Sequence, residues 1–351
     1  MSHVLITGGS GFIGSHICIS LLENNYKLVV LDNEANSTSK CLIRIKKFFE
    51  NKINSIEDKL IYINVDMRDF SELTKIFQNL ERRNIFIDCV IHLAGLKDMS
   101  KSFLKPLEYW DNNLVGSINL LKVMEKFSCR NIVFSSSASI YDSQINKKFT
   151  EDSKISPINP YGLTKLTIEK MLHNLYEASS CKWKIINLRY FNPAGAHYSG
   201  NFGENPLDKS SNLFPLITKV AVGKLDSIKI FGKDWPTNDG TAERDFIHVM
   251  DLAQAHLLAM EYLNNEKELY ISINIGSGQK TSILNLIRIF EEVNKCQIPI
   301  KFCSRRKGDA AVLIADISLA KKLLKWEPKK TIIDICKDGW NWQNRNPNGY
   351  L

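Results

Sequence analysis

A tyrosine and a lysine four residues apart, Tyr161 and Lys165, are the side chains of this chain best suited to proton transfer. They follow Pro160 at the start of an amphipathic stretch, so a helix would place both on one face. A phenol is a weak base at its ordinary pKa of about 10, but a nearby ammonium would stabilise the phenolate and lower that pKa. Ser137, in the run Ser135–Ser137 that closes an apolar segment, could hydrogen bond to the same reacting oxygen.

Three glycines, Gly8, Gly11 and Gly14, join the first apolar run to the first amphipathic stretch. Small residues there allow a tight turn, close approach of the backbone to a pyrophosphate, and a helix N-terminus that favours anions. Asp32 ends the second apolar run 24 residues beyond Gly8, where it would bind ribose hydroxyls and repel a 2′-phosphate. The sequence therefore predicts NAD as the cofactor, and a positive nicotinamide ring would further stabilise a Tyr161 phenolate.

Short apolar runs that alternate with amphipathic stretches must position these residues. They predict an α/β fold: a Rossmann-type doubly wound parallel sheet with a smaller C-terminal α/β substrate-binding lobe. The predicted strands are Val4–Thr7, Leu28–Leu31, Leu60–Val65, Cys89–Leu93, Asn131–Phe134 and Lys184–Arg189. The predicted helices between them are Phe12–Glu23, Leu42–Asn51, Ser71–Arg82, Leu107–Phe127 and Tyr161–Ala178.

The alternation stops after about Phe191, where Asn192–Gly195 and the polar stretch to Asn212 are typical of an extended loop. We therefore expect an NAD-binding Rossmann domain over residues 1–191 and mainly a substrate-binding lobe over 192–351, with the chain crossing between them. The predicted helices of the second part are Phe214–Val222, Met250–Leu263, Ile283–Asn294, Ile317–Leu323 and Ile332–Trp342.

The composition is that of an ordinary globular protein, with 44% hydrophobic and 24% charged residues. The net charge of +8 comes from scattered basic residues without a long run, which argues against a nucleic-acid partner. The eight cysteines lack Cys-x-x-Cys or metal-ligand spacing, so we expect reduced thiols and no metal. Neither a leader pattern nor a membrane-spanning apolar run is present, and we expect a cytoplasmic protein without membrane contact.

Taken together, these motifs resemble the UDP-glucose 4-epimerase family of the extended short-chain dehydrogenase/reductases. The resemblance extends along nearly the whole chain. It is carried by Gly8–His16, Leu31–Asn36, His92–Lys97, Lys105–Asn113, Phe134–Ala138, Tyr161–Lys165, Leu188–Ala196, Asn212–Pro215, Phe231–Gly232, Asp239–Asp251, Arg305–Asp309 and Trp340–Gln343.

The resemblance implies a role for further residues. Those implied to be catalytic are Ser137, Tyr161 and Lys165. Those implied to bind NAD are Gly8, Gly11, Phe12, Ile13, Asp32, Asn33, Asn36, Ser37, Asp66, Met67, Leu93, Ala94, Gly95, Lys97, Asn112, Ser135, Tyr161, Lys165 and Tyr190. Those implied to bind the UDP-sugar are Lys97, Ser137, Tyr161, Phe191, Asn192, Asn212, Leu213, Lys229, Phe231, Arg244, Arg306, Asp309 and Leu313.

The implied reaction is redox-neutral epimerisation of UDP-glucose and UDP-galactose at C4, in galactose metabolism. Tyr161 removes the C4 hydroxyl proton, tightly bound NAD takes the C4 hydride, and hydride returns to the other face of a transient 4-keto sugar. The resemblance also implies a homodimer, with Leu107–Phe127 and Tyr161–Ala178 as the expected contact.

Three departures from the family pattern bear on activity. Asp98 to Lys101 replace a segment that commonly reads Ala-Val-Gly-Glu, which reverses a charge beside the expected site. Asp142 follows Tyr141 where glycine is usual, and a positive φ there would strain it. Leu313 stands where a bulky Tyr is associated with refusal of N-acetylated sugars and a small Cys with acceptance, so the activity toward UDP-GlcNAc and UDP-GalNAc stays open.

Two other functions compete with this one. A nucleotide-sugar dehydratase or decarboxylase needs an added carboxylate at the serine run, and Ser136–Ser139 supply none. A catalytically silent NAD-binding regulator would share the fold but would not need Ser137, Tyr161 and Lys165. Following UDP-galactose turnover separates the three, because a dehydratase gives a 4-keto-6-deoxy product and a regulator gives none.

Overall fold

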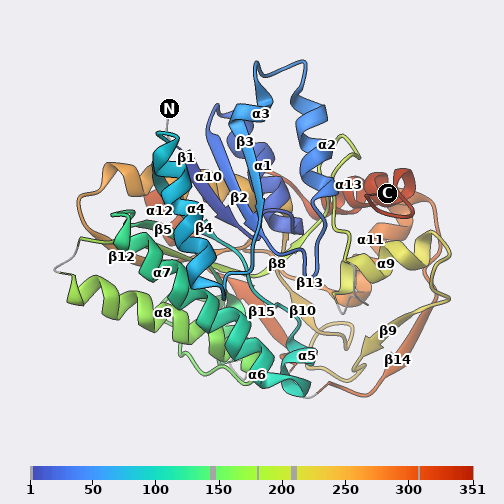
Figure 1. Ribbon diagram of the computed structural model, residues 1–351. Helices are drawn as coiled ribbons and strands as arrows, with labels where there is room; N and C mark the ends of the chain where they lie inside the picture. The colour runs from blue at the N-terminus through green and yellow to red at the C-terminus, as the bar shows by residue number, and fades with distance from the viewer. Residues whose placement is uncertain (1–2, 143–147, 180–181, 207–211, 307–308, 351) are drawn as a thin grey trace. The chain divides into compact units, whose positions relative to one another are not determined.

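The computed structural model describes residues 3–142, 148–179, 182–206, 212–306 and 309–350. Its largest sheet has seven strands in the order β12-β7-β5-β4-β1-β2-β3 (Figure 1). The strands are β1 (His3–Thr7), β2 (Lys27–Asp32), β3 (Leu60–Asn64), β4 (Ile87–His92), β5 (Asn131–Ser137), β7 (Lys184–Tyr190) and β12 (Leu269–Ile275). Strands β1 to β5 pair in parallel, so their carboxyl ends share one edge. The predicted Rossmann-type α/β fold is confirmed.

The sequence interpretation missed the seventh strand, β12. It lies far along the chain, beyond the point where the β-α alternation stops, and its first four residues are only half-buried. Local patterning cannot reveal that such a segment joins an early sheet, because the partner strand β7 lies about eighty residues upstream.

The chain packs as two compact units. Unit 1 consists of residues 1–137, 159–188 and 253–272, and unit 2 of residues 138–158, 189–252 and 273–351. The chain therefore passes from one unit to the other several times. Assignment of the cofactor to the first part of the chain and of the UDP-sugar to the second remains a proposal.

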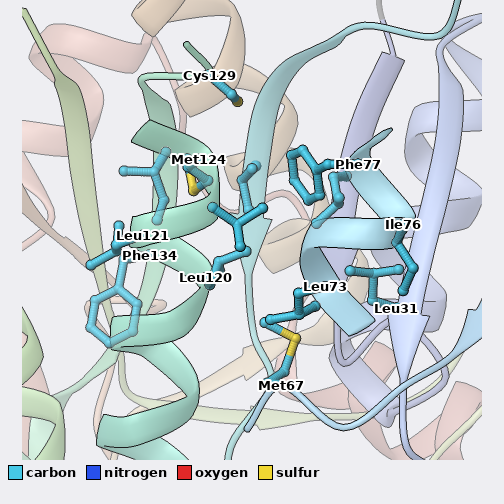
Figure 2. Close-up of a cluster of buried hydrophobic side chains, with 14 of the residues drawn as sticks. Leu31, Met67, Leu73, Ile76, Phe77, Leu120, Leu121, Met124, Cys129 and Phe134 are labelled. Carbon is cyan, nitrogen blue, oxygen red and sulfur yellow. The ribbon is translucent and has the colours of Figure 1, made fainter. Parts of the chain in front are cut away.

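The helices of unit 1 cover the sheet and complete its core. They are α1 (Phe12–Glu23), α2 (Lys40–Phe49), α3 (Ile56–Lys59), α4 (Phe70–Arg82), α5 (Met99–Leu104), α6 (Pro106–Tyr109), the π-helix η1 (Trp110–Val115), α7 (Gly116–Lys126) and α8 (Pro160–Ala178). In α4, Leu73, Ile76, Phe77 and Leu80 recur at helical spacing and are all buried. Figure 2 shows Leu73 and Phe77 of this stripe on the side of Leu120 and Met124 of α7, and Ile76 beside Leu31 of β2. Each such side chain contributes about 1.5–3 kcal/mol through burial.

The prediction of one continuous α-helix over Leu107–Phe127 is wrong, because a π-helix interrupts it. Helix α6 passes into the π-helix η1, whose wider turn precedes α7 at Gly116. A π-turn inserts one residue into the helical repeat, which rotates the following side chains relative to those before it. As a result Asn113 is turned inward and is only 2% exposed.

Unit 2 is built from short strands and its own helices. Its sheets have the orders β13-β10-β15-β6, β11-β8 and β14-β9. The strands are β6 (Lys148–Phe149), β8 (Asn192–Ala194), β9 (Ile228–Phe231), β10 (Glu243–Arg244), β11 (Phe246–His248), β13 (Thr281–Ser282), β14 (Ile300–Cys303) and β15 (Val312–Ala315). The helices are the 3-10 helix η2 (Ala138–Ile140), α9 (Leu213–Ala221), α11 (Ile283–Asn294), α12 (Ser318–Leu324) and α13 (Ile332–Arg345), while α10 (Val249–Asn265) begins here and continues into unit 1.

The segment after Phe191, predicted as an extended loop, begins with a strand. Strand β8 pairs in parallel with β11, which places Asn192 opposite Phe246. Pro193 can occupy this short strand because proline is tolerated at sheet edges. The other predicted helices and strands agree with the observed bounds within three residues. No bounds were predicted for α3, α5, η2 or the short strands of unit 2.

A buried carboxylate, Asp245, joins three segments of unit 2. It is fully buried and accepts hydrogen bonds from the backbone N–H groups of Ser277, Gly278 and Ala315, at 2.6, 2.9 and 3.0 Å. The Ser277 hydroxyl adds a fourth at 2.7 Å. Because Asp245 lies between β10 and β11, these bonds fix Arg244 and Phe246 on either side of it.

The described helices include none long and apolar enough to cross a bilayer. Within the same residues, no group of three or more His, Cys, Asp or Glu side chains is arranged to hold a metal ion. Seven of the eight cysteines are unpaired thiols, and Cys181 lies outside the described residues.

Candidate active site

The turn between β1 and α1 is shaped by close backbone contacts. Gly8 has φ +71°, and a Cβ added to it would lie 2.8 Å from the backbone nitrogen of Ala94. A Cβ on Gly14 would lie 2.3 Å from the carbonyl oxygen of Gly8. Only glycine fits both positions, so the turn is compact and leaves the start of α1, at Phe12 and Ile13, as a cradle for an anion. This geometry fits a dinucleotide pyrophosphate.

Asp32 ends β2 beside this turn. Its carboxylate accepts bonds from the backbone N–H of Ser10 at 3.0 Å, from that of Glu34 at 2.9 Å and from the Ser37 hydroxyl at 3.1 Å. Two of these bonds reach Oδ1 and one reaches Oδ2, and a carboxylate has about four lone-pair positions. Asp32 is therefore rigidly placed and can still accept a ribose hydroxyl.

The remaining predicted cofactor residues of unit 1 follow the carboxyl ends of neighbouring strands. Asn33 donates to Asp66 at 3.1 Å, which links the segments after β2 and β3. Bonds from Arg68 hold the pKa of Asp66 well below its usual range. Asn36 and Ser37 follow β2, Asp66 and Met67 follow β3, Leu93, Ala94, Gly95 and Lys97 follow β4, Ser135 lies in β5, and Asn112 lies in η1.

Asn113, which sequence reasoning missed, ties three parts of this edge together. Its Oδ1 accepts from the backbone N–H of Leu96 at 2.7 Å, and its Nδ2 donates to the carbonyl of Leu96 at 3.0 Å. The same Nδ2 also donates to Thr164 Oγ1 at 3.1 Å, and Thr164 donates to the carbonyl of Tyr161 at 2.7 Å. The π-helix thereby fixes both the segment after β4 and the start of α8.

A buried histidine, His92, completes this network in a neutral form. Thr7 Oγ1 accepts from the N–H groups of Leu93 and Ala94, both at 3.2 Å, so it donates its own proton to His92 Nδ1 at 2.7 Å. His92 Nε2 then carries the hydrogen and donates to Ser117 Oγ at 2.8 Å. Burial, followed by the charge of Lys165, lowers the pKa of His92 to about 3.

Tyr161 lies in the first turn of α8, which is capped by Asn159 through its bond to the N–H of Gly162 at 2.7 Å. Ser137, at the end of β5, hydrogen bonds to the Tyr161 hydroxyl and lowers its pKa, while burial raises that pKa by more. The pKa of Tyr161 is therefore raised by the protein alone, and its lowering by Lys165 together with a positive nicotinamide ring stays a prediction. A positive nicotinamide ring would act in the opposite direction to burial.

Lys165, one turn after Tyr161, is buried against β5. Its Nζ donates to the carbonyl oxygen of Ser135 at 2.7 Å and lies 4.9 Å from the centre of the Phe134 ring. The same nitrogen is 6.0 Å from the centre of the Tyr161 ring. Burial lowers the pKa of Lys165 to about 7, against an opposing attraction to Glu169. The three predicted catalytic residues thus converge on one strand end and one helix start.

Unit 2 contains a second cluster, centred on two arginines. Arg306 Nε binds Asp309 at 3.0 Å, and its guanidinium lies 4.5 Å from the centre of the Phe231 ring. Arg244 is paired in register with Leu313 across β10 and β15, and it interacts electrostatically with Asp309 and Arg306. Burial lowers the pKa of Arg244 from its usual value, with Asp309 opposing the change. Two planar cations within one cluster suit a diphosphate.

Other predicted substrate residues are less closely grouped. Asn192 donates to the carbonyl of Asp245 at 3.1 Å, and Asn212 begins α9 ahead of Leu213. Lys229 and Phe231 alternate with buried residues of β9 and so share its outer face. Tyr190 and Phe191 are both buried at the end of β7.

Two of the sequence departures have structural roles. Asp98 caps α5, because its carboxylate accepts from the N–H of Lys101 at 2.9 Å. Asp142 has no positive φ and pairs with Lys154 at 2.8 Å, so the strain considered for it does not occur.

Besides Asn113, sequence reasoning missed Glu169, which accepts a hydrogen bond from Ser136. Its position four residues after Lys165 was the available signal. The signal for Asp245 was weaker, because nothing local distinguishes a buried carboxylate whose donors lie thirty or more residues away.

Comparisons with known proteins identify the family of the chain. The NAD dependent epimerase/dehydratase family matches residues 4–276. The chain is 45% identical over 347 residues to UDP-glucose 4-epimerase 2 of Arabidopsis thaliana, covering 99% of this chain and 96% of that protein. It is 42% identical over 347 residues to UDP-glucose 4-epimerase of Bacillus subtilis, covering 99% and 98%.

Solved structures show the same similarity. UDP-glucose 4-epimerase of Bifidobacterium longum, in complex with NAD+ and UDP, has a TM-score of 0.91 at 40% identity, covering 99% of this chain and 100% of that one. The enzyme from Stenotrophomonas maltophila, with bound NAD and formylated UDP-arabinopyranose, has a TM-score of 0.91 at 39% identity, covering 99% of each chain.

The Gly14→Ala variant tests the dinucleotide turn. Its Cβ would lie 2.3 Å from the Gly8 carbonyl oxygen, so the turn must open. We expect the dinucleotide that copurifies with the protein, measured after acid release, to fall about tenfold or more. Ser15→Ala, which loses the hydroxyl bonded to the Phe12 carbonyl and to His16 Nδ1 and adds no atom to the turn, is the matched control. Equal dinucleotide content in both variants would contradict the assignment.

Proposed function

Because the chain belongs to the NAD dependent epimerase/dehydratase family, we propose that it interconverts UDP-glucose and UDP-galactose by epimerisation at C4. The observation that carries this proposal is the convergence of Tyr161, Lys165 and Ser137 at the carboxyl edge of the parallel sheet. A phenol, an ammonium and a hydroxyl so placed can move a proton to and from a sugar hydroxyl.

In this function Tyr161 takes the proton of the C4 hydroxyl and later returns it. Ser137 hydrogen bonds to the Tyr161 oxygen and supports the phenolate. The Lys165 ammonium stabilises the same phenolate electrostatically and is held in place by the Ser135 carbonyl. Lys165 is buried and Tyr161 is half-buried, so water is largely excluded around the ammonium, which strengthens these interactions.

The cofactor site fits NAD, as the glycine turn and the free acceptor capacity of Asp32 indicate. When bound, NAD supplies a reversible hydride acceptor, so the overall reaction is redox-neutral. Gly8 and Gly14 shape the pyrophosphate cradle, Asp32 orients the ribose, and Asn33, Asp66 and Met67 would hold the adenine side.

The UDP moiety would be held by the arginine cluster of unit 2. Arg244 and Arg306 supply planar donors to the diphosphate, and Asp309 fixes Arg306. The resemblance adds Asn192, Asn212, Leu213, Lys229 and Phe231 to this set. Binding energy concentrated on UDP rather than on the hexose would leave the sugar free to turn over.

The two competing functions are less well supported. A dehydratase needs a carboxylate acid or base beside the sugar, but Glu169, the carboxylate bonded to the serine run, is only 3% exposed and accepts from Ser136. A silent regulator would not require the Tyr161–Ser137 bond or the buried Lys165. Conversion of UDP-galactose to UDP-glucose by the purified protein distinguishes all three.

Tyr161→Phe removes the proposed base and leaves the fold intact. We expect turnover to fall about 10²–10⁴-fold. Binding of UDP and retention of NAD, measured by calorimetry and by acid release, should be unchanged. Turnover near the wild-type rate would remove Tyr161 from the mechanism.

We also propose that N-acetylated UDP-sugars are accepted, because Leu313 is smaller than the bulky tyrosine that accompanies their refusal. Its half-buried side chain stands on β15 opposite Arg244. Leu313→Tyr should lower turnover of UDP-GalNAc about tenfold or more relative to UDP-galactose, since added bulk acts on the larger substrate. Leu313→Cys should raise that ratio. A ratio that is equal in all three proteins would show that Leu313 does not set the substrate range.

We further propose a homodimer formed through the outer face of unit 1. Exposed apolar side chains gather on α5, α6, η1 and α8, which contact one another. Leu104 and Leu107 are 82% and 80% exposed, and Met99, Phe103, Val115 and Leu163 accompany them. A second copy that presents the same face would bury this patch symmetrically.

Leu104→Asp combined with Leu107→Asp tests the dimer. Charges in a symmetric apolar interface face one another, so we expect the sedimentation coefficient to fall to that of a monomer. Phe302→Asp, which changes an exposed side chain of β14, is the control and should leave the mass unchanged. A wild-type protein that sediments as a monomer would contradict the proposal.

We also propose that the protein is located in the cytoplasm. This proposal is supported by the seven described thiols, none of which is paired in a disulfide.

A further inference from the structure

The face of α8 that carries Tyr161 and Lys165 carries a third ionisable side chain. Glu169 follows Lys165 by four residues, as Lys165 follows Tyr161, so the three form a row along one face of the helix. Lys165 is 4% exposed and Glu169 is 3% exposed. A carboxylate buried this deeply next to a buried ammonium calls for a functional explanation.

Three consecutive residues of β5 hydrogen bond to the three side chains of this row. Ser137 hydrogen bonds to Tyr161, the Ser135 carbonyl accepts from Lys165 at 2.7 Å, and the Ser136 hydroxyl donates to Glu169. This hydrogen bond gives the buried Glu169 side chain a fixed partner. The backbone carbonyl of Glu169 also accepts from the Tyr270 hydroxyl at 2.9 Å, which fixes this turn of α8.

Among the groups around Lys165, Glu169 is the one whose charge counteracts the effect of burial on the pKa of Lys165. Burial disfavours the ammonium, and attraction to Glu169 favours it. From β4, His92 faces Lys165 in its neutral form. From β5, the Ser135 carbonyl and the Phe134 ring contact it but carry no charge. From α8 itself, Tyr161 becomes negative only when it acts as a base.

We propose that Glu169 is a positioning residue which, held by Ser136, keeps Lys165 protonated beside Tyr161. The inference rests on the proposed function, in which the Lys165 ammonium stabilises the Tyr161 phenolate. Glu169 itself touches neither substrate nor cofactor in this role. It acts only through the charge of Lys165.

Glu169→Gln tests the proposal, because glutamine keeps the shape and can still accept from Ser136 while it loses the charge. We expect Lys165 to lose its proton about one pH unit lower or more. The measurement is the chemical shift of the ¹³Cε atom of Lys165 in protein labelled at lysine, assigned with Lys165→Arg. This readout does not require turnover.

Turnover provides the second readout. The ratio of Glu169→Gln to wild-type turnover should be near one at low pH, where both proteins carry the ammonium. It should fall by about tenfold per pH unit once only the variant has lost its proton. Glu169→Asp keeps the charge and should recover part of the loss, whereas Glu177→Gln, on an exposed position two turns further along α8, should change neither readout.

Either of two results would overturn the proposal: Lys165 titrating at the same pH in Glu169→Gln, or a loss of turnover that is equal at all pH values. If Glu169→Gln fails to fold, as judged by circular dichroism, Ser136→Ala carries the test, because loss of its donor should shift Lys165 by a smaller amount in the same direction. A wild-type protein that does not epimerise UDP-galactose would instead refute the proposed function, and the Lys165 titration would still be readable.

Discussion

The burial of one ammonium group, that of Lys165, constrains the rest of unit 1. Taking this group out of water lowers its pKa from 10.5 to about 7, which corresponds to about 5 kcal/mol against the charged form. That penalty is present in full below pH 7 and declines between pH 7 and 10.5, where only the unfolded chain keeps the proton. The fold must therefore supply a fixed acceptor, and the Ser135 carbonyl provides it. A small shift between α8 and β5 would lose that bond.

The π-helix explains how the relation between α8 and the sheet is kept. An ordinary α-helical turn through residues 110–115 would not insert the additional residue that turns Asn113 inward. With Asn113 buried, its amide joins Leu96 to Thr164 and hence to the start of α8. His92 extends the same network to Thr7. Since the amide of Asn113 and both ring nitrogens of His92 have partners, the network avoids the penalty of unsatisfied buried polar atoms.

Much of this arrangement could be predicted from the sequence, because its parts depend on local chemistry. The glycine turn, Asp32 at the end of β2, and the Tyr161–Lys165 pair each follow from spacing within one β-α unit. What could not be predicted depends on partners distant in the chain. Strand β12 joins the sheet from residue 269 onward, and Asp245 finds its donors at Ser277 and Ala315. The π-helix was missed because a one-residue insertion leaves the apolar spacing close to that of an α-helix.

In the proposed mechanism, the pKa of Tyr161 couples cofactor binding to proton transfer. The protein's own groups raise this pKa, since burial outweighs the bond from Ser137, so Tyr161 is kept as a phenol by the fold alone. A base is needed only while a hydroxyl proton is being removed, and a positive charge brought close to Tyr161 at that stage favours the phenolate. Once that positive charge is neutralised, burial favours the phenol again. Tyr161 then keeps the proton until it returns it to the sugar oxygen. If the pKa of Tyr161 were low at every stage, Tyr161 would lose the proton too readily before returning it to the sugar. The burial of Tyr161 is thus better suited to a reaction that must run in both directions than a permanently lowered pKa would be.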